Sequence, residues 1–259
     1  MVSKYLERNV PILGGRGKYK VDARFMRTVA LLVLLAVSFS VYANSLEGGF
    51  VFEDYSFIHQ DNFIKQPHYI PQIFGGAHYP VFLSHNLYRP LRSLSYMLDY
   101  QLWGYRAFGY KLTNLLLHCL NVLLVYLLAT YLLETRCAAF LTALFFAVHP
   151  VHTEVVNAIY NRSDSLYVFF YLLSLLFFIG YLTYSRPSAS GGWPRPVVFY
   201  SLSLLAFLGS LCSKESAITA LPMLILLHHA FKRGWCRQKY VDIPKGYLCH
   251  LQFWIIGVT

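Results

Sequence analysis

Charged residues are scarce in this chain. They make up 13% of its 259 residues, whereas hydrophobic residues make up 56%, and the mean hydropathy is +0.44. An average soluble domain carries about 25% charged residues, so these charges are too few to cover a water-soluble surface. The same composition excludes intrinsic disorder and a collagen-like chain, and five cysteines do not make a disulfide-rich secreted domain. A polytopic membrane protein remains, and a 17% aromatic content suits its membrane interfaces.

Six apolar runs predict an all-α membrane bundle. They cover residues 28–46, 112–133, 138–148, 165–184, 197–212 and 217–231. A membrane helix needs roughly 20 residues, so the third run is short and could be a re-entrant segment. A seventh run starts near Tyr247 and reaches the chain end at Thr259. We therefore expect a truncated seventh span.

The basic residues predict the orientation of the bundle. With the N-terminus in the cytoplasm, 15 of the 22 Lys and Arg residues fall in cytoplasmic segments and seven fall outside. This asymmetry follows the positive-inside rule and favours a crossing third run. It also explains the net charge of +10 as a signal of topology. The expected partner is therefore the lipid bilayer, and nucleic acid is not expected.

These patterns divide the chain into a basic cytoplasmic N-terminus, 1–27, and a transmembrane domain, 28–259, with a first outer loop at 47–111. A cleavable signal peptide is the alternative for the N-terminus, but its basic region is long for a signal. The cysteines do not indicate a disulfide framework. The outer loop is aromatic and amphipathic around residues 69–74, which predicts short helices lying on the membrane surface.

An acidic pair, Glu53 and Asp54, follows the first span by about seven residues. We expect it in an exposed loop near the outer interface. Such a pair can act as a base or bind a divalent cation. The alternative is a solvated acidic turn without catalytic work.

The second outer loop contains His149, His152 and Glu154, followed by Asp164 at the start of the next run. Two histidines and a glutamate suggest a metal site. Their i, i+3, i+5 spacing does not place all three on one helical face, however, and Pro150 indicates a helix start. We expect interfacial hydrogen bonding instead of a metal.

Lys214 and Glu215 lie between the last two complete runs, and His118 lies inside the second. Adjacent charges near a membrane can end two helices or point into a shared cavity. For His118 we expect a neutral ring that is hydrogen-bonded between helices.

Several motifs occur in order over about residues 45–230. They are Gly49-Phe50-Val51-Phe52-Glu53-Asp54, Tyr88-Arg89-Pro90-Leu91, Asn114-Leu115-Leu116-Leu117-His118, Phe146-Ala147-Val148-His149-Pro150-Val151-His152-Thr153-Glu154, Arg162-Ser163-Asp164 and Ser213-Lys214-Glu215-Ser216-Ala217-Ile218-Thr219. In these motifs the chain resembles the N-terminal part of the TMTC family, the transmembrane O-mannosyltransferases that modify cadherins, and its prokaryotic relatives. The run from Phe146 to Glu154 is the most specific part of this resemblance.

The resemblance implies a GT-C-like helical bundle with a catalytic acidic pair in the first outer loop. The family's Asp-Asp corresponds to Glu53-Asp54, so the first acid differs. Its Gly-Arg-Ala-Asp corresponds to residues 161–164, where Arg162 and Asp164 are kept. The family also carries a C-terminal array of tetratricopeptide repeats, which this chain lacks.

The function that follows is transfer of a sugar, expected to be mannose, from a polyprenyl-phosphate or dolichyl-phosphate donor to Ser or Thr of exported proteins. Asp54, with Glu53, would act as general base. Four cations would hold the donor phosphate: Arg89, Arg92, Arg162 and Lys214. Five residues would line the acceptor side or the cavity: His149, His152, Glu154, Asp164 and Glu215. The lipid-linked sugar is a substrate, and no cofactor is expected, a divalent metal being the alternative.

Two other classes remain open from the sequence. A non-catalytic scaffold or assembly subunit on the same fold would suit a truncated chain. A transporter would place charges in mid-span, whereas here they lie at the outer ends. The expected location is the endoplasmic reticulum membrane in a eukaryote and the inner membrane in a bacterium.

Overall fold

The structure is a computed structural model that describes residues 23–75, 88–185 and 194–233, and all regular elements within these ranges are helical. The predicted all-α membrane fold class is confirmed. The seventh run, most of the basic N-terminus and nearly all of the basic segment 232–245 lie outside the described residues, so those predictions stay predictions.

Each predicted span corresponds to one long helix. These helices are α1 (Ala23–Tyr42), α4 (Ala107–Leu132), α5 (Arg136–Val148), α7 (Arg162–Tyr184), α8 (Pro194–Leu211) and α9 (Ala220–Lys232). The outer segments form α2 (Ile70–Phe74), α3 (Pro90–Trp103), α6 (His152–Asn157) and short helical turns, which are η1 (Ala43–Glu47), η2 (Ser56–Gln60), η3 (Phe63–Lys65), η4 (Pro67–Tyr69), η5 (Ile159–Asn161) and η6 (Glu215–Thr219).

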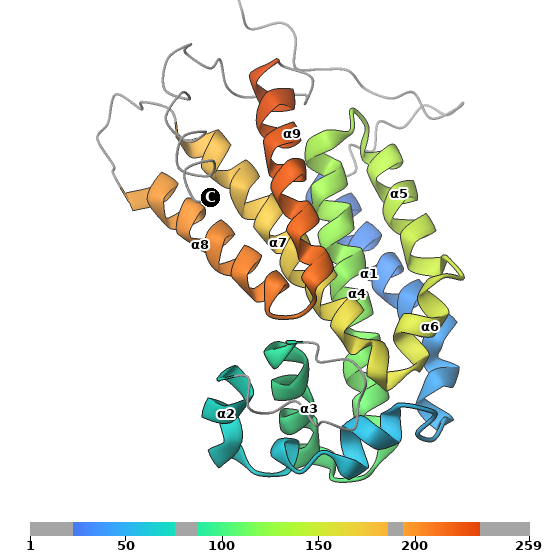
Figure 1. Ribbon diagram of the computed structural model, residues 1–259. Coiled ribbons are helices and arrows are strands. Elements are labelled where there is room, and N and C mark those ends of the chain that lie inside the picture. The colour runs from blue at the N-terminus through green and yellow to red at the C-terminus, as the bar shows by residue number, and fades with distance from the viewer. Residues whose placement is uncertain (1–22, 76–87, 186–193, 234–259) are drawn as a thin grey trace, which may run out of the picture.

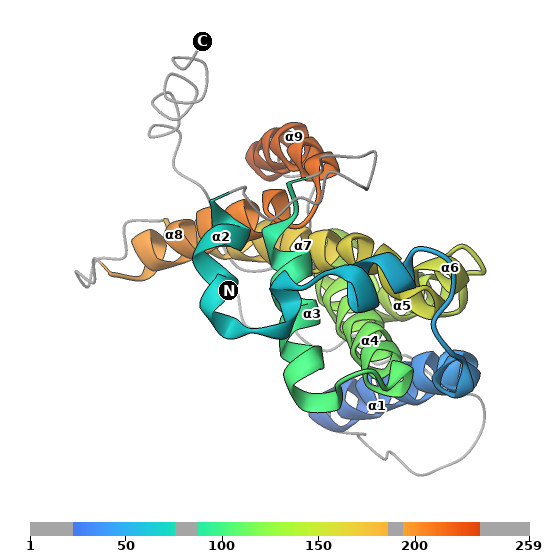
Figure 2. The ribbon, with the colours of Figure 1, turned by 60° about the horizontal axis from the view of Figure 1, so that its bottom comes forward.

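The long helices alternate in direction along the bundle. In Figure 1, α4, α7 and α9 run from the lower end to the upper end, whereas α1, α5 and α8 run back. α4 and α7 pack against each other, α1 and α5 pack on α4, and α8 and α9 pack on α7. All polar outer segments therefore meet at one end of the bundle (Figures 1 and 2).

Three helices of the described part are long and apolar enough to cross a membrane: Phe25–Glu47, Ala107–Leu132 and Ile159–Tyr184. α5 and α8 are apolar but shorter. At 1.5 Å per residue, the 13 residues of α5 extend about 20 Å, less than a hydrocarbon core of roughly 30 Å. Even so, α5 returns the chain to the outer end of α1, where the Tyr42 hydroxyl donates to the His149 carbonyl at 3.0 Å.

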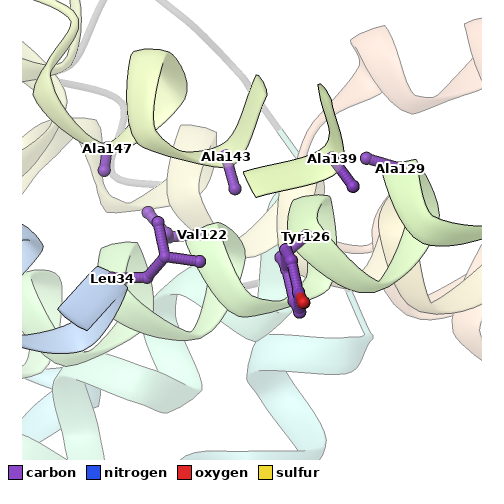
Figure 3. Packing of buried hydrophobic residues seen from close by; sticks show 7 residues of the cluster. All are labelled: Leu34, Val122, Tyr126, Ala129, Ala139, Ala143 and Ala147. Carbon is purple, nitrogen blue, oxygen red and sulfur yellow. The ribbon is translucent and has the colours of Figure 1, made fainter. Parts of the chain in front are cut away.

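Small side chains let α5 lie close to α4 and α1. Ala139, Ala143 and Ala147 recur every four residues on one face of α5, and all three are fully buried. Figure 3 shows this face directed at a cluster that contains Leu34, Val122, Tyr126 and Ala129. Close approach of helices through small residues is the usual basis of helix packing in membranes.

The α7–α8 contact also depends on small residues. The Ser174 hydroxyl donates to the Ser203 carbonyl at 3.0 Å, and the Ser203 hydroxyl donates to the Ser174 carbonyl at 2.9 Å. A Cβ added at Gly180 would lie 2.7 Å from the ring of Phe199. These contacts fix the position of α8 and hence of the η6 turn that follows it.

The described residues of the first outer loop form a layer that shares one core with the second outer loop. Its buried residues come from the short helices, from α3 and from the outer end of α4: Ile58, Ile64, Ile73, Tyr96, Met97, Tyr110 and Ile159. α4 is shared between this layer and the membrane bundle, because its first turns lie in the layer and the rest lies among the spans (Figure 1). The layer is thereby fixed rigidly to the bundle.

Candidate functional site

The segment 157–163, between α6 and α7, is the centre of the polar outer end. The Asn157 carbonyl accepts from Lys111 Nζ at 2.8 Å, and the Ile159 carbonyl accepts from the Tyr96 hydroxyl at 2.6 Å. The Tyr160 backbone N–H donates to Asp54 Oδ1 at 2.8 Å. The first outer loop, α3 and α4 are therefore all anchored to this segment.

The acidic turn, residues 51–54, is held by the Asp54 side chain. Asp54 Oδ2 accepts from the Val51 backbone N–H at 2.9 Å, and the Asp54 N–H donates to the Val51 carbonyl at 2.9 Å. Phe52 has a φ of 46°, in the left-handed region that a non-glycine residue rarely adopts. Strain of this kind persists only where surrounding contacts fix it, and it is common at functional sites.

The two acids of the turn occupy opposite environments. Asp54 is fully buried, whereas Glu53 and Phe52 are exposed. The expectation that Asp54 lies in an exposed loop is therefore wrong, because its carboxylate is enclosed by the backbone groups it binds. Burial raises the pKa of Asp54 above its ordinary value, against the opposing effects of the Val51 and Tyr160 N–H groups and the Lys111 charge.

Arg162 is fully enclosed at the start of α7. Its Nε donates to Asn114 Oδ1 at 2.8 Å, its Nη2 donates to the Tyr110 carbonyl at 2.8 Å, and its Nη1 pairs with Asp99 Oδ2 at 2.5 Å. The guanidinium also lies over the Tyr96 ring, 4.8 Å from its centroid. This arginine joins α3, α4 and α7, and every guanidinium nitrogen has a protein partner.

Arg89 lies at the start of α3, between α7 and η6. Its Nε and Nη2 donate to the two carboxylate oxygens of Glu215, at 3.2 and 2.6 Å, and its Nη1 donates to Ser163 Oγ at 3.2 Å. Next to it, the Leu91 N–H donates to the Cys212 carbonyl at 3.2 Å. The exposed fraction is 11% for the Arg89 side chain and 60% for that of Glu215. The ion pair lowers the pKa of the Glu215 carboxyl.

Two further cations border this place. Lys214 Nζ donates to Asp164 Oδ1 at 2.6 Å, and both side chains are partly exposed. The guanidinium of Arg92 lies over the Phe57 ring, 4.2 Å from its centroid, and the residue is buried. Residues far apart in sequence, from 89 to 215, thus form one polar region.

The histidines form a separate aromatic cluster beside α6. The His152 ring lies 5.2 Å from that of His118, 4.3 Å from that of Phe146 and 6.0 Å from that of His149. His118 Nε2 lies 3.1 Å from the Ala147 carbonyl, which is the contact between helices expected for it. Burial, then the neighbouring His118 and His149, lowers the pKa of His152 to about 4.

The Glu154 carboxylate accepts from the Asn161 amide at 3.1 Å. Among the described residues, no three His, Cys, Asp or Glu side chains gather closely enough to hold a metal ion.

Two features of this region escaped the sequence analysis. Lys111 is 4% exposed and its Nζ lies beside Gly48, three residues before the acidic turn, and Asp99 is the buried partner of Arg162. The sequence holds a weak indication for Lys111. This residue lies one helical turn before Asn114, immediately outside the apolar run that starts at Leu112. A polar helix face that continues a span beyond its apolar run indicates a buried outer layer.

A helical membrane bundle whose outer end gathers an exposed acid, a strained turn and paired cations belongs to the class of integral membrane proteins with a polar site at one membrane face. The comparisons with known proteins give this class a family. The chain is 34% identical over 190 residues to the protein O-mannosyl-transferase Tmtc1 of Drosophila melanogaster. It is 33% identical over 214 residues to TMTC1 and 32% identical over 210 residues to TMTC4 of Homo sapiens.

These matches cover 72%, 76% and 74% of this chain, and 21%, 23% and 28% of the respective relatives. The chain is therefore a TMTC-like protein, and the resemblance found in its motifs is confirmed. It spans only about a quarter of the length of the relatives it matches. No protein-family model matches the chain, and no solved structure matches it.

Proposed function

We propose that the chain provides the membrane site of a protein O-mannosyltransferase. In this proposal it moves mannose from a polyprenyl-phosphate or dolichyl-phosphate donor to a Ser or Thr hydroxyl on the outer side of the membrane. The names of the relatives support the reaction class. The observation that carries the proposal is the acidic turn, whose strained backbone presents an exposed carboxylate at the outer end of the bundle.

Within this site we assign the general base to Glu53. A base must come within hydrogen-bond reach of the hydroxyl that it deprotonates, and Glu53 is the exposed member of the pair. Asp54 then acts as a positioning residue, because both of its oxygens bind backbone N–H groups of the protein. This assignment exchanges the roles expected from the sequence, in which Asp54 was the base.

Arg89 and Lys214 are the candidates for holding the donor phosphate. Arg89 presents a planar fork that suits a phosphate, and its present partner is a carboxylate, which is also a two-oxygen anion. Such cations would stabilise the charge that the leaving phosphate gains. Arg162 receives a positioning role in this proposal, because its guanidinium is enclosed by Asn114, Tyr110 and Asp99.

The test is transfer of labelled mannose from the lipid phosphate donor to a Ser/Thr peptide, in membranes that contain the full chain. Glu53→Gln removes the proton acceptor and is expected to lower transfer by about 10²-fold or more. The matched control is Glu47→Gln, an exposed carboxylate in the same outer segment. Equal rates in wild type and Glu53→Gln would remove the catalytic assignment and leave a non-catalytic membrane subunit as the better explanation.

A further inference from the structure

Lys111 is a buried cation with no place in the assignments above. It lies near the outer end of α4 and is 4% exposed. Its ammonium group donates a hydrogen bond to the Asn157 carbonyl at 2.8 Å. A buried ammonium is costly unless a negative charge or several acceptors compensate for it, so one neutral carbonyl does not account for its position.

Asp54 is the carboxylate whose charge interacts with that of Lys111. Both residues are tied to the same short segment, Lys111 at Asn157 and Asp54 at Tyr160. Burial of the Asp54 carboxyl opposes its ionisation, and the Lys111 charge counters this effect by lowering the pKa of Asp54. Gly48 leaves room for this ammonium, since a Cβ there would lie 3.0 Å from Lys111 Nζ.

The ionised form of Asp54 matters for the shape of the acidic turn. An ionised carboxylate has acceptors only, so both of its oxygens can accept from the N–H groups of Val51 and Tyr160. A protonated carboxyl would direct an O–H toward one of these donors and lose that bond. The turn that exposes Glu53 would then lose one of its two anchors.

We propose that Lys111 is a positioning residue that keeps Asp54 ionised inside the protein and thereby holds the acidic turn in its strained, Glu53-presenting shape. The effect of Lys111 on the shape of the turn is independent of the proposed function. The use of Glu53 as a base rests on the proposed function. Within the described part of the chain, Tyr96 and Tyr160 also feel the charge of Asp54, and Glu53 is its neighbour in sequence. Lys111 is thus the only cation among these groups.

The test measures protonation of Asp54 directly. Dicyclohexylcarbodiimide modifies carboxyl groups in their protonated form, and mass spectrometry of the full chain in detergent reports modification at Asp54 as a function of pH. Lys111→Met is expected to move the midpoint of this profile upward by at least about one pH unit, because an opposite charge nearby lowers a carboxyl pKa by roughly one to three units. Lys111→Arg keeps the charge and is expected to restore the wild-type midpoint.

The matched control is Lys65→Met. Lys65 also lies in the outer layer and donates to a backbone carbonyl, that of His59, at 3.0 Å. It does not act on Asp54, so its removal should leave the Asp54 profile unchanged. An unchanged profile in Lys111→Met, or an equal shift in Lys65→Met, would overturn the inference.

A second measurement covers the case in which Lys111→Met folds poorly. In an Asp54→Asn background there is no carboxylate for Lys111 to serve, so adding Lys111→Met should cost clearly less thermal stability than it does in the wild type. An equal loss in both backgrounds would show that Lys111 supports only the Asn157 carbonyl, and the inference would fail. Neither measurement uses sugar transfer, so loss of the proposed activity and loss of this inference are separate results.

Discussion

Arg89 and Glu215, 126 positions apart in the sequence, meet in a two-point ion pair in which one partner is buried and the other is mostly in solvent. Because the Glu215 side chain is already mostly in solvent, its carboxylate can move away from Arg89 with little change in its own hydration. The buried Arg89 side chain stays in place. A carboxylate and a phosphate compete for the same guanidinium fork. Glu215 therefore occupies the place that the donor phosphate takes in our proposal.

We predict that Glu215→Gln tightens binding of a polyprenyl phosphate several-fold, because a neutral amide competes less well for Arg89. Arg89→Gln is expected to weaken the same binding by about tenfold or more, which corresponds to the roughly 1.5–3 kcal/mol of a charged hydrogen bond. Binding is measured with the lipid in detergent micelles. Weaker binding in Glu215→Gln would show that Glu215 holds Arg89 in place and does not compete with the phosphate. Unchanged binding in Arg89→Gln would show that the phosphate binds elsewhere.

The acidic pair should separate into a stability role and an activity role. Asp54→Asn is expected to cost about 1–3 kcal/mol, because the amide cannot accept from both the Val51 and the Tyr160 N–H groups. Glu53→Gln, at an exposed position, should change stability by less than about 0.5 kcal/mol. Thermal unfolding in detergent measures both. Equal stability losses would contradict the separation of roles.

Arg162 is expected to be a stability residue. Arg162→Met leaves Asp99 buried without its ionic partner, a change that typically costs about 3–5 kcal/mol. The same substitution at Arg106, which is exposed, serves as the control and should have little effect. A stable, well-folded Arg162→Met variant would show that the enclosed guanidinium is not needed for the outer layer.

His152 should make the protein sensitive to acid. Its folded-state pKa of about 4 lies below the ordinary value of 6.5, so the unfolded chain binds a proton that the folded site rejects. Stability is therefore fully present above about pH 6.5 and decreases as the pH falls toward 4. His152→Gln should flatten this part of the stability profile, whereas His68→Gln, at an exposed position, should not. Identical profiles in the three proteins would contradict the role of His152.

The topology is testable with single cysteines in a background without the natural ones. Labels at Gln66, in the outer layer, and at Glu134, between α4 and α5, should react from opposite sides of sealed vesicles. The basis is the alternating direction of the helices together with the positive-inside bias. Reaction of both positions from the same side would show that the bundle is inserted differently.

The helices were predictable because each is encoded by its own apolar run. The run 138–148 anticipated α5, and the run 165–184 anticipated α7, to within three residues at each end. The outer layer was not predictable in this way. Its key contacts join residues 46 to 126 positions apart, such as Lys111 with Asn157 and Arg89 with Glu215. A hydropathy pattern also predicts that charged side chains are exposed. That prediction is wrong for Asp54 and Arg162, which are buried because protein groups bind their charged atoms.

The segment 157–163 has a consequence for how such a sequence can vary. Within seven residues it meets the first outer loop through Asp54, α3 through Tyr96 and α4 through Lys111. An inserted or deleted residue would shift all of these contacts out of register at once. We expect related proteins to accommodate changes of length elsewhere in the outer layer and to keep this segment at constant length.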